Sequence, residues 1–276
     1  MISPFVSNVF RLSAARIVLI ALLLTIAVSP AVSAADDWGH LRGRILVSGD
    51  VAPAAELEIT RDPEVCGQLK LTDESLIVHP ENRGLRFAAV WVDSKEKLPI
   101  HPNHMAAPET PPVLDNKDCR FEPRVMAVRT ASPVQFSNSD PVAHNVAVYG
   151  RRNTPFSEIV PASQPLEKSF AKAEVLPVRI DCSIHAWMKS WLIIQDHPYV
   201  AVTDADGNFE IRDLPAGEWR FRFWHERPGN LTDLQTPDGP KTLDKGIWVI
   251  RIVPGETTEL GLLQIESKQL TGSKKK

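Results

Sequence analysis

Beyond its first 30 residues, this sequence is interrupted by proline and glycine so often that long helices have no room to form. The 276 residues include 23 prolines and 14 glycines, and both residue types weaken or end regular helices. The segments between them are short, alternate apolar with polar side chains and are rich in Val, Ile, Phe and Trp, which is the pattern of β-strands. We therefore expect an all-β protein with no helix longer than a turn or two.

Two breaks divide this pattern into parts. A Pro-rich, polar stretch at 98–113 (LPIHPNHMAAPETPPV) predicts an irregular connector, and a second break falls at 196–198. We expect an N-terminal β segment with its connector at 35–111, a central domain at 112–197, a C-terminal β segment at 198–268 and a basic tail at 269–276. The expected strands are 41–47, 85–92, 125–129, 134–138, 145–149, 175–181, 190–195, 209–211, 219–224 and 247–252.

Residues 1–34 have the layout of a secretory signal peptide. Arg11 and Arg16 precede the apolar run 17–28, a Ser-Pro pair ends the run, and small residues at 32–34 offer a cleavage site. The run is shorter than the roughly 20 residues that span a bilayer, so we favour cleavage over the alternative of a retained anchor. The mature protein would then be periplasmic or secreted, with no membrane segment.

The charge balance argues against a nucleic-acid partner. The formal net charge is −3, and cleavage removes Arg11 and Arg16 but no acidic residue, which leaves −5. The only basic run of the mature chain is 274–276, which is too short for a nucleic-acid footprint. We therefore expect no nucleic-acid binding.

The chain has three cysteines, an odd number, which in an exported protein indicates one disulfide and one thiol with a separate role. Cys182 lies close to His185 and Met188, whereas Cys66 and Cys119 lie in loop-like contexts without such neighbours. We therefore assign Cys66 and Cys119 to a disulfide. Closing the loop between them would stabilise the fold by about 4 kcal/mol on a chain-entropy basis.

The sequence CSIHAWM places a thiolate, an imidazole and a thioether, from Cys182, His185 and Met188, within seven residues after a strand-like run. Copper that cycles between Cu(I) and Cu(II) uses this mixture: two imidazoles and a thiolate in a plane, with a weak axial Met sulfur. His144 is the best candidate for the missing imidazole. It follows a strand and turn and precedes another strand, so a sandwich can bring it to the same end as Cys182.

These residues resemble the cupredoxins, and the ligand loop is similar to that of amicyanin-like proteins, with its short Cys-x2-His-x2-Met spacing. Their first His precedes the Cys by a similar interval, which here is 38 residues. The stretch 121–146 (FEPRVMAVRTASPVQFSNSDPVAHNV) also resembles the cupredoxin opening, in which two strands lead to Asn-x-Asp and then His-Asn-Val. The chain departs from the family at 131–132, where a Gly-containing turn is usual, and at Trp187, where amicyanin has another aromatic residue.

The resemblance implies a cupredoxin-like Greek-key β-sandwich that binds copper as one type 1 centre. It implies that His144 and His185 are the equatorial imidazole ligands, Cys182 the thiolate and Met188 the axial thioether. Asn145 would support the ligand loop and the sulfur by hydrogen bonds, which set ligand orientation and redox potential. Taken singly, each residue is more often a buried thiol, core filler or a satisfied polar group; the combination favours copper.

Four protein ligands leave no open position for a substrate, so we expect outer-sphere electron transfer and no enzymatic activity. His185, Ala186 and Trp187 would form the patch where a redox partner protein docks. Two alternatives stay open. One is a copper carrier or sensor with the same ligands but no redox turnover. The other is a metal-free cell-surface β-sandwich interaction module in which Cys182 is a buried thiol.

The flanking segments resemble the carboxypeptidase regulatory-like (transthyretin-like) β domain. Residues 202–226 contain its T-D-x-x-G-x-F and L-P-x-G elements and an aromatic strand, and residues 41–59 look like its first strand and turn. If both belong to it, the copper domain is inserted in a discontinuous second β-sandwich; otherwise the two segments are unrelated. The aromatic residues at 219–224 are expected to be core and face residues of a strand.

Other candidate residues favour a structural role. His101 and His104 lie in the Pro-rich connector without a third ligand in the sequence nearby, and His197 and His225 are expected to be cap or surface residues. The segment around Asp204 (DADG) lacks the later Glu of a calcium-binding EF-hand loop. It indicates a hairpin turn.

Overall fold

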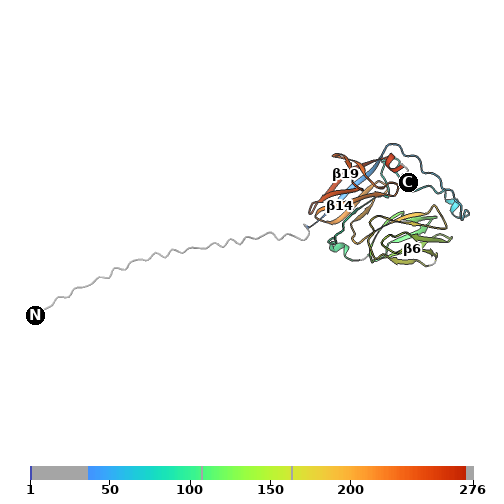
Figure 1. Cartoon of the computed structure of the whole chain (residues 1–276), viewed down its shortest axis with the longest axis horizontal. Coiled ribbons are helices and arrows are strands. Elements are labelled where there is room, and N and C mark those ends of the chain that lie inside the picture. The colour runs from blue at the N-terminus through green and yellow to red at the C-terminus, as the bar shows by residue number, and fades with distance from the viewer. Residues whose placement is uncertain (2–36, 107, 163, 272–276) are drawn as a thin grey trace. The chain divides into compact units, whose positions relative to one another are not determined.

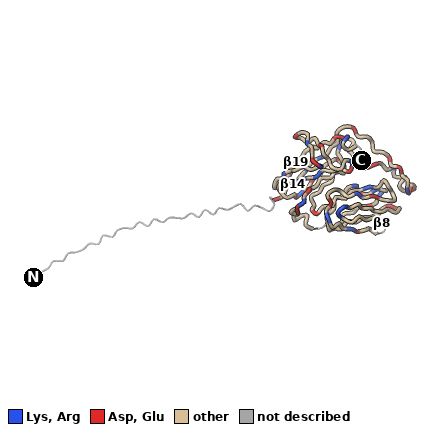
Figure 2. The backbone as a smooth tube through the Cα atoms, viewed as in Figure 1, with Lys and Arg blue, Asp and Glu red and all other residues tan. Residues whose placement is uncertain are grey.

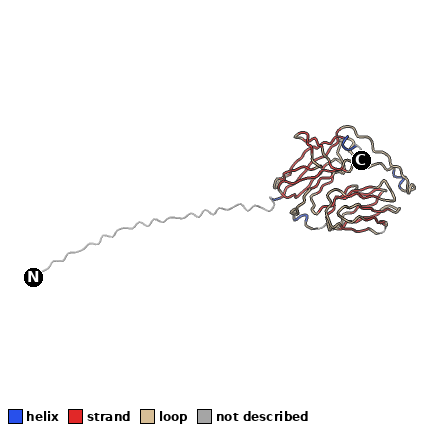
Figure 3. Tube along the Cα trace, viewed as in Figure 1, coloured by secondary structure: helices blue, strands red, loops and turns tan. Residues whose placement is uncertain are grey.

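Strands account for most of the regular structure in the computed structural model (Figure 3). The structure describes Met1 and residues 37–106, 108–162 and 164–271. The expected signal peptide, apart from Met1, and the last residues of the basic tail therefore lie outside the described residues. The described residues from 37 to 271 belong to one compact unit. Within the described part of the chain, no helix is both long and apolar enough to cross a membrane.

Two sheets form a first sandwich (Figure 1). One has the strand order β13 (Asn208–Pro215), β1 (Trp38–Ser48), β19 (Thr257–Glu266), β16 (Asp233–Thr236) and β17 (Gly239–Thr242). The other has the order β12 (Val200–Val202), β2 (Ala89–Val92), β14 (Gly217–His225) and β15 (Gly229–Asn230), with β18 (Ile247–Ile252) also paired to β14. Alternate side chains of both sheets, such as Ile45 of β1 and Phe221 and Phe223 of β14, meet in one buried core.

The two ends of the chain build this first sandwich together. Strand β1 pairs antiparallel with β13 and parallel with β19, and β2 lies between β12 and β14. Both flanking segments thus share the same two sheets. The remaining strands, β3 to β11, leave the first sandwich after β2 and return to it at β12.

Strands β3 to β11 form a second sandwich around its own core. One sheet has the order β5 (Val125–Arg129), β11 (Lys189–Gln195), β10 (Val178–Asp181), β7 (His144–Val148) and β8 (Phe156–Val160). The other has the order β4 (Arg120–Glu122), β3 (Val113–Lys117), β6 (Pro133–Asn138) and β9 (Leu166–Ser169). Phe136, Val146, Ile180 and Leu192 fill the space between them. The fold is therefore all-β, as predicted, with two β-sandwiches.

The helical elements are short, which agrees with the expectation from the sequence. They are the 3-10 helices η2 (Cys66–Leu69) and η3 (Pro102–His104) and the terminal α1 (Ser267–Thr271). Basic and acidic residues are interspersed along the backbone of both sandwiches (Figure 2). The helix η3 lies in the Pro-rich connector, and η2 lies in the irregular segment between β1 and β2.

The pairing of β7 with β10 sets the position of the candidate site. The two strands are antiparallel, with Ala147 opposite Asp181 and Val148 opposite Ile180. Because antiparallel neighbours run in opposite directions, the start of β7 and the end of β10 lie at the same end of the sheet. His144 begins β7 and Cys182 follows β10 directly, so the register brings both residues together.

Candidate metal centre

Three of the four residues expected as ligands meet at this end of the second sandwich. A ring nitrogen of His144, a ring nitrogen of His185 and the sulfur of Cys182 all lie within 4.8 Å of one another. The two imidazole ring centroids are 4.6 Å apart, and Cys182 Sγ lies 3.8 Å from His185 Nδ1. All three side chains are buried. Two segments of the chain therefore converge on one small space.

His144 has one satisfied and one unsatisfied ring nitrogen. Its Nε2 lies 2.9 Å from Asp140 Oδ2, and the Asp140 carboxylate also accepts the backbone N–H groups of Asp118 and Cys119. His144 Nδ1 is buried and has no hydrogen-bond partner among the residues that the structure describes. A buried polar atom without a partner costs about 1–3 kcal/mol, and a bound metal ion would remove that cost. The residues therefore fit a metal site.

The electrostatics of the site favour a thiolate. Burial raises the pKa of the Cys182 thiol, but the neighbouring His144 ring and the backbone N–H groups around the sulfur outweigh burial and lower it. Burial likewise lowers the pKa of His144, but the hydrogen bond with Asp140 and the nearby Cys182 sulfur outweigh it and raise the pKa to about 9. The thiolate is the form of cysteine that binds metals.

The ligand loop is a closed turn. The backbone N–H of Met188 donates to the carbonyl of His185 at 3.0 Å, and that of Cys182 donates to the carbonyl of Met188 at 3.3 Å. Met188 is 2% exposed and belongs to the same buried cluster as Cys182, with Ile184 and Trp187 packed against it. These hydrogen bonds therefore hold the backbone of Met188 against the backbone of Cys182.

Asn145 ties the ligand loop to strand β7. Its Oδ1 accepts hydrogen bonds from the backbone N–H and the hydroxyl of Ser183, at 2.6 and 2.9 Å. Its Nδ2 donates to the hydroxyl of Ser157 on β8, at 2.9 Å. The Asn145 side chain thus links the ligand loop to β8, the edge strand of the sheet. The sequence analysis expected Asn145 to support the ligand loop in this way.

The assigned disulfide between Cys66 and Cys119 is present, with the Cα atoms 5.6 Å apart. It attaches residues 57–71, which we call the cap, to the second sandwich. Apolar residues of the cap form a cluster with residues of that sandwich: Leu57, Ile59, Val65, Cys66 and Leu71 with Cys119, Val142 and Trp187. Trp187 Nε1 also donates to the carbonyl of Cys119 at 3.0 Å. The N-terminal segment therefore covers one side of the candidate site.

The cap places Asp62 on His185. Asp62 Oδ2 lies 2.7 Å from His185 Nε2, and the His185 side chain is 0% exposed. Burial lowers the pKa of His185, and the Asp62 carboxylate opposes this shift only in part. The sequence led us to expect His185 in an exposed docking patch; the structure instead buries the ring, because a segment distant in sequence folds over it. No local pattern around Asp62 points to this contact.

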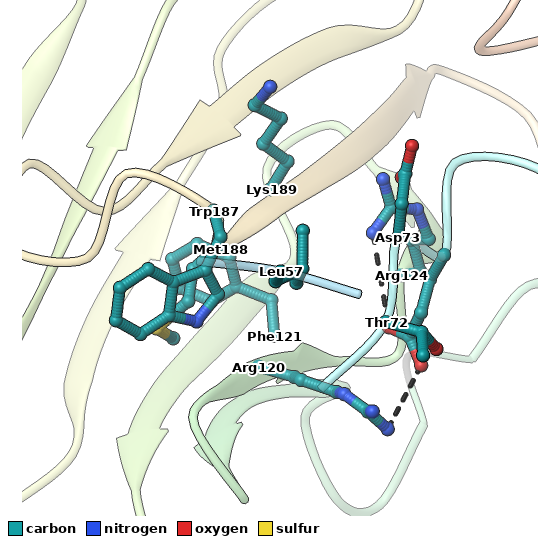
Figure 4. A pocket seen from close by; sticks show the side chains of 10 residues that line it. Leu57, Thr72, Asp73, Arg120, Phe121, Arg124, Trp187, Met188 and Lys189 are labelled. Carbon is teal, nitrogen blue, oxygen red and sulfur yellow. Dashed lines mark ion pairs between the residues drawn. The ribbon is translucent and has the colours of Figure 1, made fainter. Parts of the chain in front are cut away.

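A small cavity lies beside the end of the ligand loop (Figure 4). Its volume is about 20 Å³, and Leu57, Thr72, Trp187 and Met188 are among the residues that line it. A space of this size holds about one water molecule.

A second group of possible metal donors consists of Cys119, Asp140 and His144. The sulfur of Cys119 belongs to the disulfide and is no thiolate. Asp140 already accepts two backbone hydrogen bonds and the contact from His144. This group is therefore part of the support of His144 and not a separate metal site.

The other histidines lie away from this centre. His101 and His104 both approach Asp213, with nitrogen-to-oxygen distances of 3.8 and 3.1 Å. His197 and His225, expected as cap or surface residues, are buried, and burial lowers the pKa of His197 to about 4 and that of His225 to about 3. Both therefore stay neutral at pH 7: the His197 ring is held against the carbonyl of Val92 at 3.0 Å, and His225 is the last residue of β14.

A turn forms around Asp204 as predicted, but it is not the turn of a hairpin, because the strands on its two sides, β12 and β13, belong to different sheets. The backbone N–H of Gly207 donates to the carbonyl of Asp204, and Gly207 has a φ of 81°, which favours glycine. The turn joins β12 to β13.

No protein-family model matches this chain, and no curated protein sequence matches it. Parts of solved structures are similar to it. A copper-containing nitrite reductase from Thermus scotoductus is 20% identical over 35% of this chain and 25% of its own, with a TM-score of 0.29. Amicyanin from Paracoccus versutus is 18% identical over 38% of this chain and 96% of its own, with a TM-score of 0.28.

A purple cupredoxin from Nitrosopumilus maritimus is 16% identical over 30% of this chain and 95% of its own, with a TM-score of 0.25. This chain spans about a quarter of the length of the nitrite reductase that it matches. At these scores the likeness supports no conclusion about individual residues. The geometry of the site is therefore what bears on function.

Proposed function

We propose that this chain is an exported copper-binding protein that carries one type 1 copper and acts in outer-sphere electron transfer, not as an enzyme. The observation that carries the proposal is the buried His144 Nδ1 without a partner, close to a thiol with a lowered pKa and to a second imidazole. Two imidazoles and a thiolate, with a nearby thioether, are the donor set that copper uses when it changes oxidation state.

In this proposal His144 and His185 supply the imidazoles, Cys182 the thiolate and Met188 the axial sulfur. Bound copper would accept and release one electron. Other groups of the chain orient these donors before any metal binds. Backbone hydrogen bonds hold the ligand loop closed, and the carboxylates of Asp140 and Asp62 favour a proton on Nε2 of each imidazole. Each Nδ1 is then the nitrogen that faces the metal, which it binds in its unprotonated form.

Burial of the site supports electron transfer over substrate chemistry. All three clustered donors are buried, and the cavity beside Met188 has room for about one water molecule. A redox partner protein would therefore approach from outside and exchange electrons through protein atoms, on the side of Trp187, which is partly exposed. Export agrees with the N-terminal sequence and with the disulfide, since structural disulfides persist in oxidising compartments.

The test is a titration of the purified mature protein with Cu(II), followed by its visible and electron paramagnetic resonance spectra. We expect saturation at one copper per chain, with a strong thiolate-to-copper absorption band. Cys182→Ser should abolish the band, and Met188→Leu should alter the spectra. Met126→Leu is the matched control, because Met126 lies in the same core outside the ligand loop and is 8% exposed.

Two results would contradict the proposal. One is a wild-type protein that binds Cu(II) without a thiolate band, and the other is a band that persists in Cys182→Ser. A wild-type protein with the band but without reversible reduction would instead favour the copper carrier or sensor.

A further inference from the structure

We infer that Asp62, in the cap, is a positioning residue for His185, and that the cap closes the direct route from the His185 ring to a redox partner. The inference rests on the proposed copper site and adds a residue that lies outside the second sandwich. Asp62 is 123 residues away from His185 in sequence, yet its Oδ2 lies 2.7 Å from His185 Nε2.

The contact fixes the tautomer of the ring. A carboxylate can only accept a hydrogen bond, so at this distance His185 Nε2 carries the proton and donates it. His185 Nδ1 then carries the lone pair, and this atom lies 3.8 Å from Cys182 Sγ. Asp62 therefore turns the metal-binding nitrogen of His185 toward the thiolate. Asp140 does the same for His144 from within the second sandwich.

Asp62 is held in place by the backbone of the cap. The carbonyl of Asp62 accepts the backbone N–H groups of Val65 and Cys66, at 3.0 and 2.8 Å. Cys66 is fully buried and is bonded to Cys119 of the second sandwich. The turn that carries the Asp62 carboxylate is therefore fixed by two backbone hydrogen bonds, and the Cys66–Cys119 disulfide attaches this turn to the second sandwich.

The same contact covers the ring. The His185 side chain is 0% exposed, whereas that of Asp62 is 34% exposed. A partner that approaches from this side therefore meets Asp62 and the cap before it meets the imidazole. Electrons would cross an extra layer of protein here, so this centre would exchange electrons more slowly than one with a bare histidine at the surface.

Asp62 also adds a negative charge next to a ligand. Negative charge stabilises Cu(II) more than Cu(I), because Cu(II) carries the larger positive charge. Loss of a hydrogen-bonding group behind a metal ligand lowers metal affinity by about 10- to 100-fold. Removing Asp62 should therefore weaken Cu(II) binding by about that factor, weaken Cu(I) binding less and raise the reduction potential.

The experiment compares Asp62→Ala, Asp62→Asn and Glu64→Ala in the full mature chain. Asp62→Ala removes the charge, the acceptor and the cover, whereas Asp62→Asn removes the charge and keeps an acceptor and most of the bulk. Glu64 is exposed and lies in the same loop, so Glu64→Ala is a charge-matched control. Cu(II) affinity is measured by competition with a chelator, and electron exchange by the reaction with a small inorganic redox complex.

We expect Asp62→Ala to lower the Cu(II) affinity by about 10- to 100-fold, to raise the potential and to speed electron exchange. Asp62→Asn should raise the potential but leave the exchange rate near that of the wild type, because the ring stays covered. Glu64→Ala should match the wild type in all three measurements. If Asp62→Ala also matches Glu64→Ala, Asp62 neither positions nor covers His185.

A measurement without copper separates this inference from the proposed function. Nuclear magnetic resonance of the metal-free protein, labelled with ¹⁵N at histidine, reports the tautomer and the solvent exchange of each ring N–H. We expect a slowly exchanging Nε2–H on His185 that is lost in Asp62→Ala. If this signature holds but no thiolate-to-copper band forms, the copper proposal fails and the positioning stands. If the band forms but the ring N–H exchanges equally fast in both proteins, the inference is overturned.

Discussion

At the level of single residues, each imidazole of the candidate site is backed by a carboxylate: Asp140 contacts His144, and Asp62 contacts His185. Cys182, His185 and Met188 are recognisable because their residue types are chemically rare together and fall within one loop. The carboxylates that contact the histidines carry no such signal. Asp140 is four residues before His144, and Asp62 is 123 residues before His185. An acidic residue in a loop is common, so only the folded structure singles these two out.

Asn145 is the supporting residue whose role is most easily tested by substitution. Asn145→Ala removes the acceptor of the Ser183 backbone N–H and hydroxyl, and a hydrogen bond of this kind contributes about 0.5–1.5 kcal/mol to stability. We expect a loss of that size in the free energy of unfolding, measured by denaturant titration, together with a weaker or shifted thiolate-to-copper band. Ser157→Ala is the control, since it removes only the partner of Asn145 on β8. Equal behaviour of the two variants would show that the loop does not depend on Asn145.

At the level of elements, the sequence indicates strands with clean alternation and misses those whose pattern is broken. Segment 247–252 coincides with β18, and 134–138 differs from β6 by one residue. Strands β8 and β9 were not predicted because, at the edges of their sheets, they carry charged residues that protect an exposed edge. Strand β19 was missed because Gly261 and two adjacent leucines interrupt its alternation, where its register with β1 shifts.

The disulfide is the element that attaches the cap, and its contribution to stability can be measured. The double variant Cys66→Ser/Cys119→Ser frees a loop with a sequence separation of 53. On a chain-entropy basis this lowers the free energy of unfolding by about 4 kcal/mol. Denaturant titration checks the value, and wild-type protein treated with a thiol reductant should approach the double variant. A variant as stable as the oxidised wild type would mean that the crosslink does not stabilise the fold.

At the level of the whole described structure, the two sandwiches have separate cores but share a contact surface. Trp91 and Trp224 of the first sandwich pack with Val125 and Ile193 of the second. The first sandwich also supplies the cap, so it takes part in the candidate site. The sequence offered the inserted arrangement as one of two alternatives, because the two flanking segments resemble parts of one β domain. It did not reveal the cap, which is a loop that crosses from one sandwich to the other.

The central claim is that residues from two segments hold a single copper ion, and X-ray absorption spectroscopy of the copper-loaded mature protein tests it most directly. We predict one short bond from copper to a thiolate sulfur, two bonds to imidazole nitrogens and loss of the sulfur bond in Cys182→Ser. A copper ion surrounded only by oxygen and nitrogen, with the Cys182 thiol still free to react, would contradict the account.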